Sequence, residues 1–406
     1  MKLSEVRKIA RSQRERIEGA DLGLTRESLA SLPDIVSHAL IVSGIRRCGK
    51  STILHQFTQR IGKPFFYLNF DDLRLSAFSV PDYGLLDAII HESGCPFLFF
   101  DEIQSAPDWE LYIRQKLDER FQIIITGSNA SLLGGELGTK LTGRHITKEL
   151  HPFSYSEFLA FKGISACFGT LQEYLGSGGF PEYLKTGNED ILSQLQQDIL
   201  YRDVAIRHGI RDIASLKRLL TYLVSNAGYP VSPSKLTGTI GVKSPSTVLE
   251  YFSHLEASYL LHQIPRFAWS AKAQSLAPKK VYIADLGLIR TGSLSFSPNT
   301  GSLLENFVFL EYRRNTDDIY YFSDGKSECD FIVQPHSDKP YCVQVCWKLT
   351  MDNENREIAG LVAALDFFSL SDGLIITADT SDTILTNGKT IRVVPAHTLA
   401  QPTEHT

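Results

Sequence analysis

The chain has 406 residues, of which 43% are hydrophobic and 21% are charged, and this balance excludes a disordered protein. Its length predicts two to four domains of about 100 to 200 residues each. The net charge of −5 excludes a surface that is positive throughout, so any nucleic-acid contact needs a local basic patch.

Three further features of composition bear on where the protein works. No apolar run approaches the ~20 residues of a membrane span, and residues 1–8 lack the apolar core of a secretory signal. The six cysteines are scattered without a C-x-x-C pair, which argues against structural zinc and disulfides. We therefore expect a cytoplasmic protein with no membrane partner.

Residues 1–20 predict an N-terminal basic helix. Arg7, Arg11 and Arg14 alternate there with acids such as Glu15 and Glu18. A solvated helix is the simplest interpretation, and a contact with phosphate or with a partner protein is the alternative.

Residues 39–52 contain the most informative motif of the chain. The β-branched run 39–42 predicts a buried strand, and the next eight residues match G-x-x-x-x-G-K-[ST] at every fixed position. Apolar Ile53, Leu54 and Phe57 follow at helical spacing, so the loop lies between a strand and a helix, as a phosphate loop requires. The predicted nucleotide contacts are Gly44, Ile45, Arg46, Arg47, Cys48, Gly49, Lys50, Ser51 and Thr52.

Each residue type in this loop has a physical role. Gly44 and Gly49 allow positive φ angles and place no Cβ between the backbone amides and an anion. These amides, with the positive end of the next helix, form a cradle for the β-phosphate. We expect Lys50 to place its ammonium group against the β- and γ-phosphates and Ser51 to ligate Mg²⁺.

A later strand delivers two acids to the same region. The apolar run 97–100 predicts a strand that is followed by Asp101 and Glu102. Ligands of open α/β sheets gather outside the carboxyl ends of the strands. We expect Asp101 to hold Mg²⁺ through water and Glu102 to orient or deprotonate an attacking water. Simple strand termination is the alternative explanation for this acidic pair.

Two further segments supply candidate polar groups. Residues 121–129 predict a strand that ends in Thr126, Ser128 and Asn129. Arg144 is a candidate for an arginine that acts on a neighbouring subunit, because its planar charged fork suits the oxygens of a γ-phosphate. An ordinary surface arginine is the alternative.

Together these motifs resemble the predicted prokaryotic AAA+ superfamily ATPases, a family with a second domain of unknown function at its C-terminus. The motifs are Gly44 to Thr52, Phe99-Phe-Asp-Glu-Ile-Gln104, Thr126-Gly-Ser-Asn129, Leu141-Thr-Gly-Arg144 and His151-Pro-Phe-Ser-Tyr-Ser-Glu-Phe158. Shorter matches at 178–183, 201–204, 244–261, 282–287 and 304–308 extend the similarity over residues 20–380.

The resemblance implies an α/β fold: a P-loop AAA+ core with a parallel sheet over 21–152, followed by a helical lid over 153–210. The strand 121–129 would insert between the phosphate-loop strand and the strand of the acidic pair. Ser128, or alternatively Asn129, would then lie between the γ-phosphate and those acids. The resemblance also favours ATP over GTP.

Residues 211–277 predict a winged helix. Its third helix begins at Ser244, a suitable N-cap, with Pro245 in the first turn, and residues 269–278 with Lys272, Lys279 and Lys280 form the wing. Such a third helix often enters the major groove of DNA. Packing without DNA is the alternative, because Lys243 is the only cation beside small uncharged residues.

Residues 278–400 resemble a restriction-endonuclease-like domain that has lost its active site. Glu305 and Asp330 match its first two acids, whereas Gln344 and Cys346 replace the acid and lysine that bind Mg²⁺ and steady water. Lys348 would share the strand face by alternation and is a candidate substitute for the lysine.

We therefore expect a cytoplasmic, Mg²⁺-dependent ATP-binding protein and slow AAA+ ATPase. Its nucleotide state would be coupled to the winged helix and the inactive nuclease-like domain, and Arg144 would act within a homo-oligomer. The alternatives are an ATP-controlled DNA-binding regulator and a metal-dependent nuclease that uses Glu305, Asp330 and Lys348.

Overall fold

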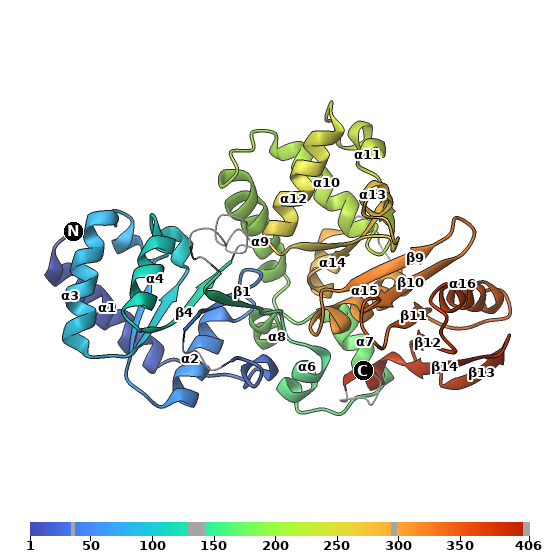
Figure 1. Ribbon diagram of the computed structural model, residues 1–406, viewed down its shortest axis with the longest axis horizontal. Helices are drawn as coiled ribbons and strands as arrows, with labels where there is room; N and C mark the ends of the chain where they lie inside the picture. The colour runs from blue at the N-terminus through green and yellow to red at the C-terminus, as the bar shows by residue number, and fades with distance from the viewer. Residues whose placement is uncertain (34–36, 129–140, 142, 294–298, 401–406) are drawn as a thin grey trace. The chain divides into compact units, whose positions relative to one another are not determined.

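The computed structural model describes residues 1–33, 37–128, 141, 143–293 and 299–400, which form two compact units (Figure 1). The first unit comprises residues 1–151 and 257–259, and the second comprises 152–256 and 260–406. Among the described residues, no helix combines the length and the apolar character needed to cross a bilayer.

The first unit is built on a parallel sheet of five strands in the order β2-β3-β4-β1-β5. The strands are β1 (Ala39–Ser43), β2 (Phe65–Asn69), β3 (Phe97–Asp101), β4 (Gln122–Gly127) and β5 (His145–Glu149). β4 lies between β1 and β3, so the predicted insertion of this strand is confirmed. All strands run parallel, so the loops after β1, β3 and β4 meet at one edge of the sheet.

Helices cover both faces of this sheet. The helices are α1 (Leu3–Glu18), α2 (Lys50–Ile61), α3 (Tyr83–Ser93) and α4 (Trp109–Asp118). Helices α1, α3 and α4 share one hydrophobic cluster with Leu98 and Phe100 of β3. Phe99 points to the opposite face, because strand side chains alternate, and there it packs edge-on against Phe57 of α2.

The predicted N-terminal basic helix has a buried side. Val6, Ile9, Ala10 and Ile17 of α1 are buried, whereas Arg11 and Arg14 pair with glutamates on its exposed side. This helix is therefore part of the core of the first unit rather than a solvated extension.

The second unit begins with a series of helices and a small sheet (Figure 1). The helices are α6 (Tyr155–Lys162), α7 (Phe168–Ser177), α8 (Pro181–Thr186), α9 (Asp190–Asp198), the π-helix η6 (Ile199–Ile206), α10 (Ile213–Ser225), α11 (Pro233–Ile240) and α12 (Pro245–Ala257). The antiparallel sheet has the order β6-β8-β7, with β6 (Pro230–Val231), β7 (Leu261–Ile264) and β8 (Lys279–Ile283). A short helix, α13 (Ala271–Leu276), lies in the segment 269–278 that we expected to form the wing.

A mixed sheet of six strands completes the second unit, in the order β13-β14-β12-β11-β10-β9. The strands are β9 (Ile319–Ser323), β10 (Glu328–Val333), β11 (Tyr341–Val345), β12 (Asp372–Thr377), β13 (Asp382–Thr386) and β14 (Lys389–Pro395). Helix α14 (Leu286–Gly292) precedes α15 (Thr300–Arg313), and α16 (Glu354–Phe367) follows β11. The chain is thus α/β in both units, as predicted.

Helix α16 lies against β10 at a position that has no room for a side chain. A Cβ atom added to Gly360 would lie 2.1 Å from the backbone oxygen of Glu328. In contrast, a Cβ added to Gly238 of α11 would meet no described atom within 4 Å. Gly360 therefore sets the distance between helix and strand.

We expect Gly360→Ala to lower the free energy of unfolding by about 1–3 kcal/mol, because the added methyl group overpacks the interface between α16 and β10. Gly238→Ala is the matched control, and it should raise that free energy by about 0.5–1 kcal/mol through helix propensity. Urea titrations followed by circular dichroism measure both. Equal stability of the two variants would contradict this packing.

Candidate nucleotide-binding site

The loop between β1 and α2 has a backbone that requires its two glycines. Gly44 has a φ angle of 146°, and a Cβ atom there would lie 2.2 Å from the backbone oxygen of Leu150. Gly49 has a φ angle of 103° and immediately precedes α2. Side chains other than hydrogen disfavour this region of φ. The predicted phosphate loop therefore has both the place and the conformation that its motif implies.

The ammonium group of Lys50 lies inside this loop. Its Nζ atom donates hydrogen bonds to the backbone oxygens of Gly44 (3.0 Å) and Ile45 (3.1 Å). The same atom lies 4.0 Å from the carboxylate of Glu102. Lys50 thus brings a buried positive charge to the point where the loop and the acidic pair meet.

The other loop residues differ in exposure. Ile45 and Cys48 are buried, Arg46 and Thr52 are half-buried, and Arg47 is exposed with a φ angle of 63°. Burial raises the pKa of the Cys48 thiol, so it stays protonated and acts as a small apolar group.

Asp101, at the end of β3, is completely buried among hydroxyl groups. Its carboxylate accepts hydrogen bonds from Ser51 (2.7 Å), Tyr67 (2.9 Å) and Thr126. Burial raises the pKa of Asp101 and the neighbouring charge of Glu102 raises it further, whereas the hydroxyl donors lower it, and the net shift is upward. Asp101 thereby connects α2, β2, β3 and β4.

Glu102 is held beside Asp101 in a left-handed backbone conformation, with a φ angle of 48°. Its backbone amide donates to the hydroxyl of Thr126 (3.2 Å). Its carboxylate accepts hydrogen bonds from Gln104 and from Ser128 (3.2 Å), and the side chain is 22% exposed. Glu102 is thus oriented by two donors and still reaches solvent.

The structure brings Ser128 to the acidic pair, as expected for the polar residue after β4. Asn129, the alternative, lies outside the described residues. Thr126 lies closer still, because its hydroxyl donates to Asp101 and accepts from the amide of Glu102. Thr126 points toward the acids because it occupies the last part of β4, next to β3.

Arg26 is a part of the site that sequence reasoning missed. Its guanidinium group donates to the backbone oxygens of Cys48 (2.8 Å) and His151 (2.7 Å), and the residue is 3% exposed. Arg26 therefore fixes the phosphate loop against the chain after β5. Nothing in its sequence context, a polar segment without periodicity, distinguishes it from a surface arginine.

A cavity of about 800 Å³ opens beside the start of α2. Its lining includes Ser51, Thr52 and His55 of α2, with Asn69 of β2 and Arg16 of α1. Ser51 borders both this cavity and the buried Asp101. The cavity provides space for a ligand next to the loop.

Arg144 does not lie near the phosphate loop of its own chain. It immediately precedes β5, whose first residue pairs with the first residue of β1, and it forms an ion pair with Asp118. Arg144 is therefore at the amino-terminal edge of the sheet, whereas the loop is at the carboxyl edge.

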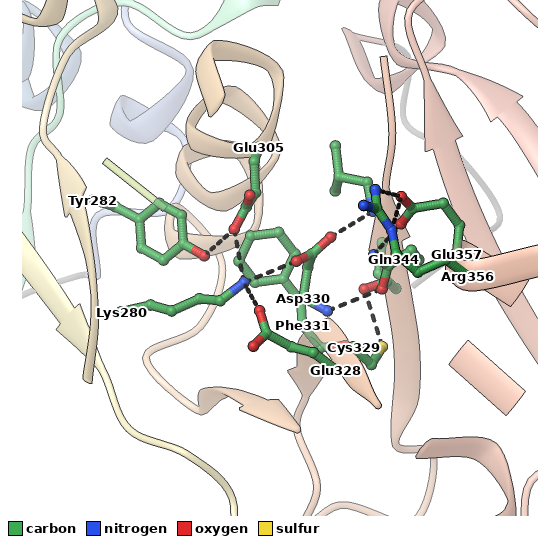
Figure 2. Close-up of polar contacts among 12 residues, drawn as sticks. Lys280, Tyr282, Glu305, Glu328, Cys329, Asp330, Phe331, Gln344, Arg356 and Glu357 are labelled. Atoms are coloured by element: carbon green, nitrogen blue, oxygen red, sulfur yellow. Dashed lines mark hydrogen bonds and ion pairs between the residues drawn. The ribbon is translucent and has the colours of Figure 1, made fainter. Parts of the chain in front are cut away.

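The acids that we compared with a nuclease site also come together, within the second unit (Figure 2). Glu305 of α15 and Asp330 of β10 both contact the ammonium group of Lys280, at 3.0 and 2.8 Å. Gln344 accepts a hydrogen bond from the amide of Asp330 (3.2 Å) and donates one to Glu357 (2.7 Å).

Two predictions about the lysines of this region are wrong. Lys348 does not share the face of β11, because the strand ends at Val345 and Lys348 is exposed beyond it, after the buried Cys346. Lys280, expected on the wing, is only 2% exposed, because its side chain lies against Glu305 of α15 and Asp330 of β10. The ammonium group near the acids therefore comes from a different part of the chain.

We expect the stability of the nucleotide-free chain to depend on pH through Asp101. The pKa of Asp101 is higher in the folded chain than its ordinary value of 3.8, so the folded state retains a proton that the unfolded state releases. This contribution to stability is present at low pH and is lost as the pH rises through the raised pKa. In Asp101→Asn, which cannot ionise, the free energy of unfolding should fall less as the pH rises above 3.8, the ordinary pKa of this carboxyl group.

Urea titrations at several pH values test this dependence. Asp118→Asn is the control, because its carboxyl group is 62% exposed and should leave the pH profile close to that of the unmodified chain. An unchanged profile in Asp101→Asn would show that the carboxyl group is not protonated by burial.

Comparison with known proteins agrees with this geometry. Residues 36–159 match the family model of an AAA domain, and residues 169–298 match a domain of unknown function. The chain is 32% identical over 357 residues to the uncharacterized protein MJ1544 of Methanocaldococcus jannaschii, which covers 82% of this chain and 80% of that protein. It is 30% identical over 332 residues to an uncharacterized protein of Haemophilus influenzae, with 76% and 82% covered.

Solved structures that align with the chain include Cdc6p of Pyrobaculum aerophilum and the RuvB Holliday junction branch migration motor of Thermotoga maritima. Cdc6p has 15% sequence identity and a TM-score of 0.27, covering 63% of this chain and 86% of that one. RuvB has 16% identity and a TM-score of 0.30, covering 64% and 92%.

The matched AAA domain spans all five strands of the parallel sheet, the phosphate loop and the acidic pair. The two relatives extend the sequence similarity over most of the chain. With a nucleotide-binding ATPase core of this kind, the chain belongs to the AAA+ superfamily of ATPases.

Proposed function

We propose that the first unit binds ATP with Mg²⁺ and hydrolyses it slowly. The observation that carries this proposal is the contact between the Ser51 hydroxyl and Asp101, next to the ammonium group of Lys50 inside the loop. Loop amides and Lys50 would hold the phosphates. Hydroxyl and carboxylate oxygens are the ligands that Mg²⁺ prefers, so Ser51 and Asp101 fit this ion. Bound Mg²⁺ would neutralise charge on the phosphate oxygens.

Glu102 would orient and deprotonate the attacking water. Its hydrogen bonds from Ser128 and Gln104 hold the carboxylate in one orientation, and its partial exposure leaves it accessible to water. Ser128, or Asn129 after it, would respond to the γ-phosphate. Arg144, at the opposite edge of the sheet from its own loop, would complete the site of a neighbouring copy in a homo-oligomer.

We also propose that the nucleotide state is coupled to the second unit, through a helical lid (153–210), a winged helix (211–277) and a nuclease-like domain (278–400). The order of α10, β6, α11, α12, β7 and β8 supports a winged helix. The order α15, β9, β10, β11, α16 and β12 supports a nuclease-like core. The domain of unknown function matched at 169–298 overlaps the first two of these segments and the first 21 residues of the third.

Replacing Glu102 by Gln should leave ATP binding intact and reduce phosphate release by ~10²–10⁴-fold, because the amide cannot accept a proton from water. Lys50→Ala should abolish binding. Isothermal titration calorimetry with Mg²⁺ measures binding, and a phosphate-release assay measures turnover. Glu92→Gln, at an exposed ion pair with Arg7, is the control. Unchanged turnover in Glu102→Gln would refute the assignment of Glu102 as the base.

A second candidate function is ATP-controlled DNA binding. The exposed Lys243 and Ser246 at the start of α12 favour it, although the burial of Lys280 removes one expected basic contact. If DNA binds there, Lys243→Glu should weaken binding of duplex DNA and reduce its dependence on salt, as judged by gel shifts. Lys217→Glu, at an exposed position of α10, should have little effect. Absence of binding by the unmodified chain at low salt would exclude this function.

A further inference from the structure

Lys280 holds three carboxylates of the second unit together (Figure 2). Its Nζ atom lies 3.0 Å from Glu305 of α15, 2.9 Å from Glu328 and 2.8 Å from Asp330, both of β10. These acids are far apart in the sequence from β8, which carries the lysine. The contact therefore joins the small sheet to the six-stranded sheet and its helix.

The position of the lysine is set by its neighbours. Asn306 of α15 exchanges two hydrogen bonds with the backbone of Ile283 on β8, at 2.8 and 2.9 Å. Tyr282, on the same strand, donates to Glu305 (2.7 Å). The register between β8 and α15 is thus fixed by contacts at Tyr282 and Ile283, next to the ion pair.

The three carboxylates use the full bonding capacity of the ammonium group. An ammonium group has three N–H donors and no acceptor, and Lys280 has three carboxylate oxygens within 3.0 Å. None of these donors remains to hold a water molecule for a hydrolytic attack. Lys280 therefore does not replace the catalytic lysine of an active nuclease.

The buried charge is stabilised by its partners. Burial by itself lowers the pKa of Lys280, but the attraction of Asp330, Glu305 and Glu328 outweighs it and raises the pKa well above its ordinary value. A buried ammonium group without such partners would be strongly unfavourable. The lysine thus carries its full charge at neutral pH.

The remaining groups around the acids are also engaged. The second oxygen of Asp330 accepts a hydrogen bond from the amide of Val345 (2.9 Å). Gln344, at the position of the expected third acid, is bonded to Asp330 and Glu357. In the described part of the chain, Lys280 and the amide of Val345 thus engage both carboxylate oxygens of Asp330, which a divalent cation would otherwise need as ligands.

We propose that the ammonium group of Lys280 is a built-in cation that takes the place of a divalent metal ion among Glu305, Glu328 and Asp330. The second unit then binds no metal at this position and does not act as a metal-dependent nuclease. A cavity of about 570 Å³ beside the cluster stays accessible for other contacts. This inference does not depend on the nucleotide site.

Removal of the lysine should create a metal site. Nucleotide-free protein is titrated with Mn²⁺, and free Mn²⁺ is measured by electron paramagnetic resonance. Lys280→Ala should bind one more Mn²⁺ ion than the unmodified chain. The affinity of this additional site should be at least ten-fold higher than that of any Mn²⁺ site in the unmodified chain. The additional site should be absent from the double variant that carries both Lys280→Ala and Asp330→Asn. Lys279→Ala, at the neighbouring and partly exposed position of β8, is the matched control and should gain no site.

Two results would overturn the proposal. One is Mn²⁺ uptake by the unmodified chain that Asp330→Asn removes, since the site would then already hold a metal. The other is a folded Lys280→Ala chain with no additional uptake. If Lys280→Ala does not fold, Lys280→Met, which keeps the length of the side chain, is used in its place. Comparison of Mn²⁺ uptake by the unmodified chain and by Asp330→Asn still shows whether the native site already holds a metal.

Discussion

The nucleotide site depends on the hydrogen bonds that the buried carboxylate of Asp101 accepts. A carboxylate removed from water needs hydrogen-bond donors, and here Ser51, Tyr67 and Thr126 come from three different elements around β3. The helix after the phosphate loop, the edge strand β2 and the inserted strand β4 are thereby held at fixed positions relative to one another. The raised pKa of Asp101 indicates that a cation at this place would favour its charged form.

The order of strands explains why these donors meet. Because β4 lies between β1 and β3, its Thr126 reaches both members of the acidic pair, donating to Asp101 and accepting from the amide of Glu102. Arg26 supports the other side of the site by bonding the loop at Cys48 and the chain after β5 at His151. The loop is therefore fixed from both sides before any ligand binds, which reduces the ordering cost of binding.

The same requirement for paired charges organises the acidic cluster of the second unit. There the buried group is a cation, Lys280, and its partners are three carboxylates. The two clusters have opposite chemical consequences. Ser51, which donates a hydrogen bond to Asp101, borders a cavity with room for a ligand, whereas every N–H donor of Lys280 is already satisfied.

Local patterns were sufficient for the elements around the phosphate loop. The phosphate loop, helix α2, strands β1 and β3 and the acidic pair follow from glycine positions and from apolar periodicity over a few residues, and the structure has them where predicted. The placement of β4 came from the resemblance of motifs rather than from periodicity. The prediction that Lys348 shares the face of β11 was wrong, because it extended the alternation of strand side chains beyond Val345, where β11 ends.

The sequence by itself determined the chemistry of the loop, since Gly44, Gly49, Lys50 and Ser51 act through backbone conformation and short-range spacing. Only the tertiary structure decided the roles of Arg26 and Lys280. Neither is marked by its local sequence as a buried residue, and each is buried by elements distant in the sequence. A cationic side chain is buried only where the fold brings hydrogen-bond acceptors or carboxylates to it. The local sequence does not contain that information.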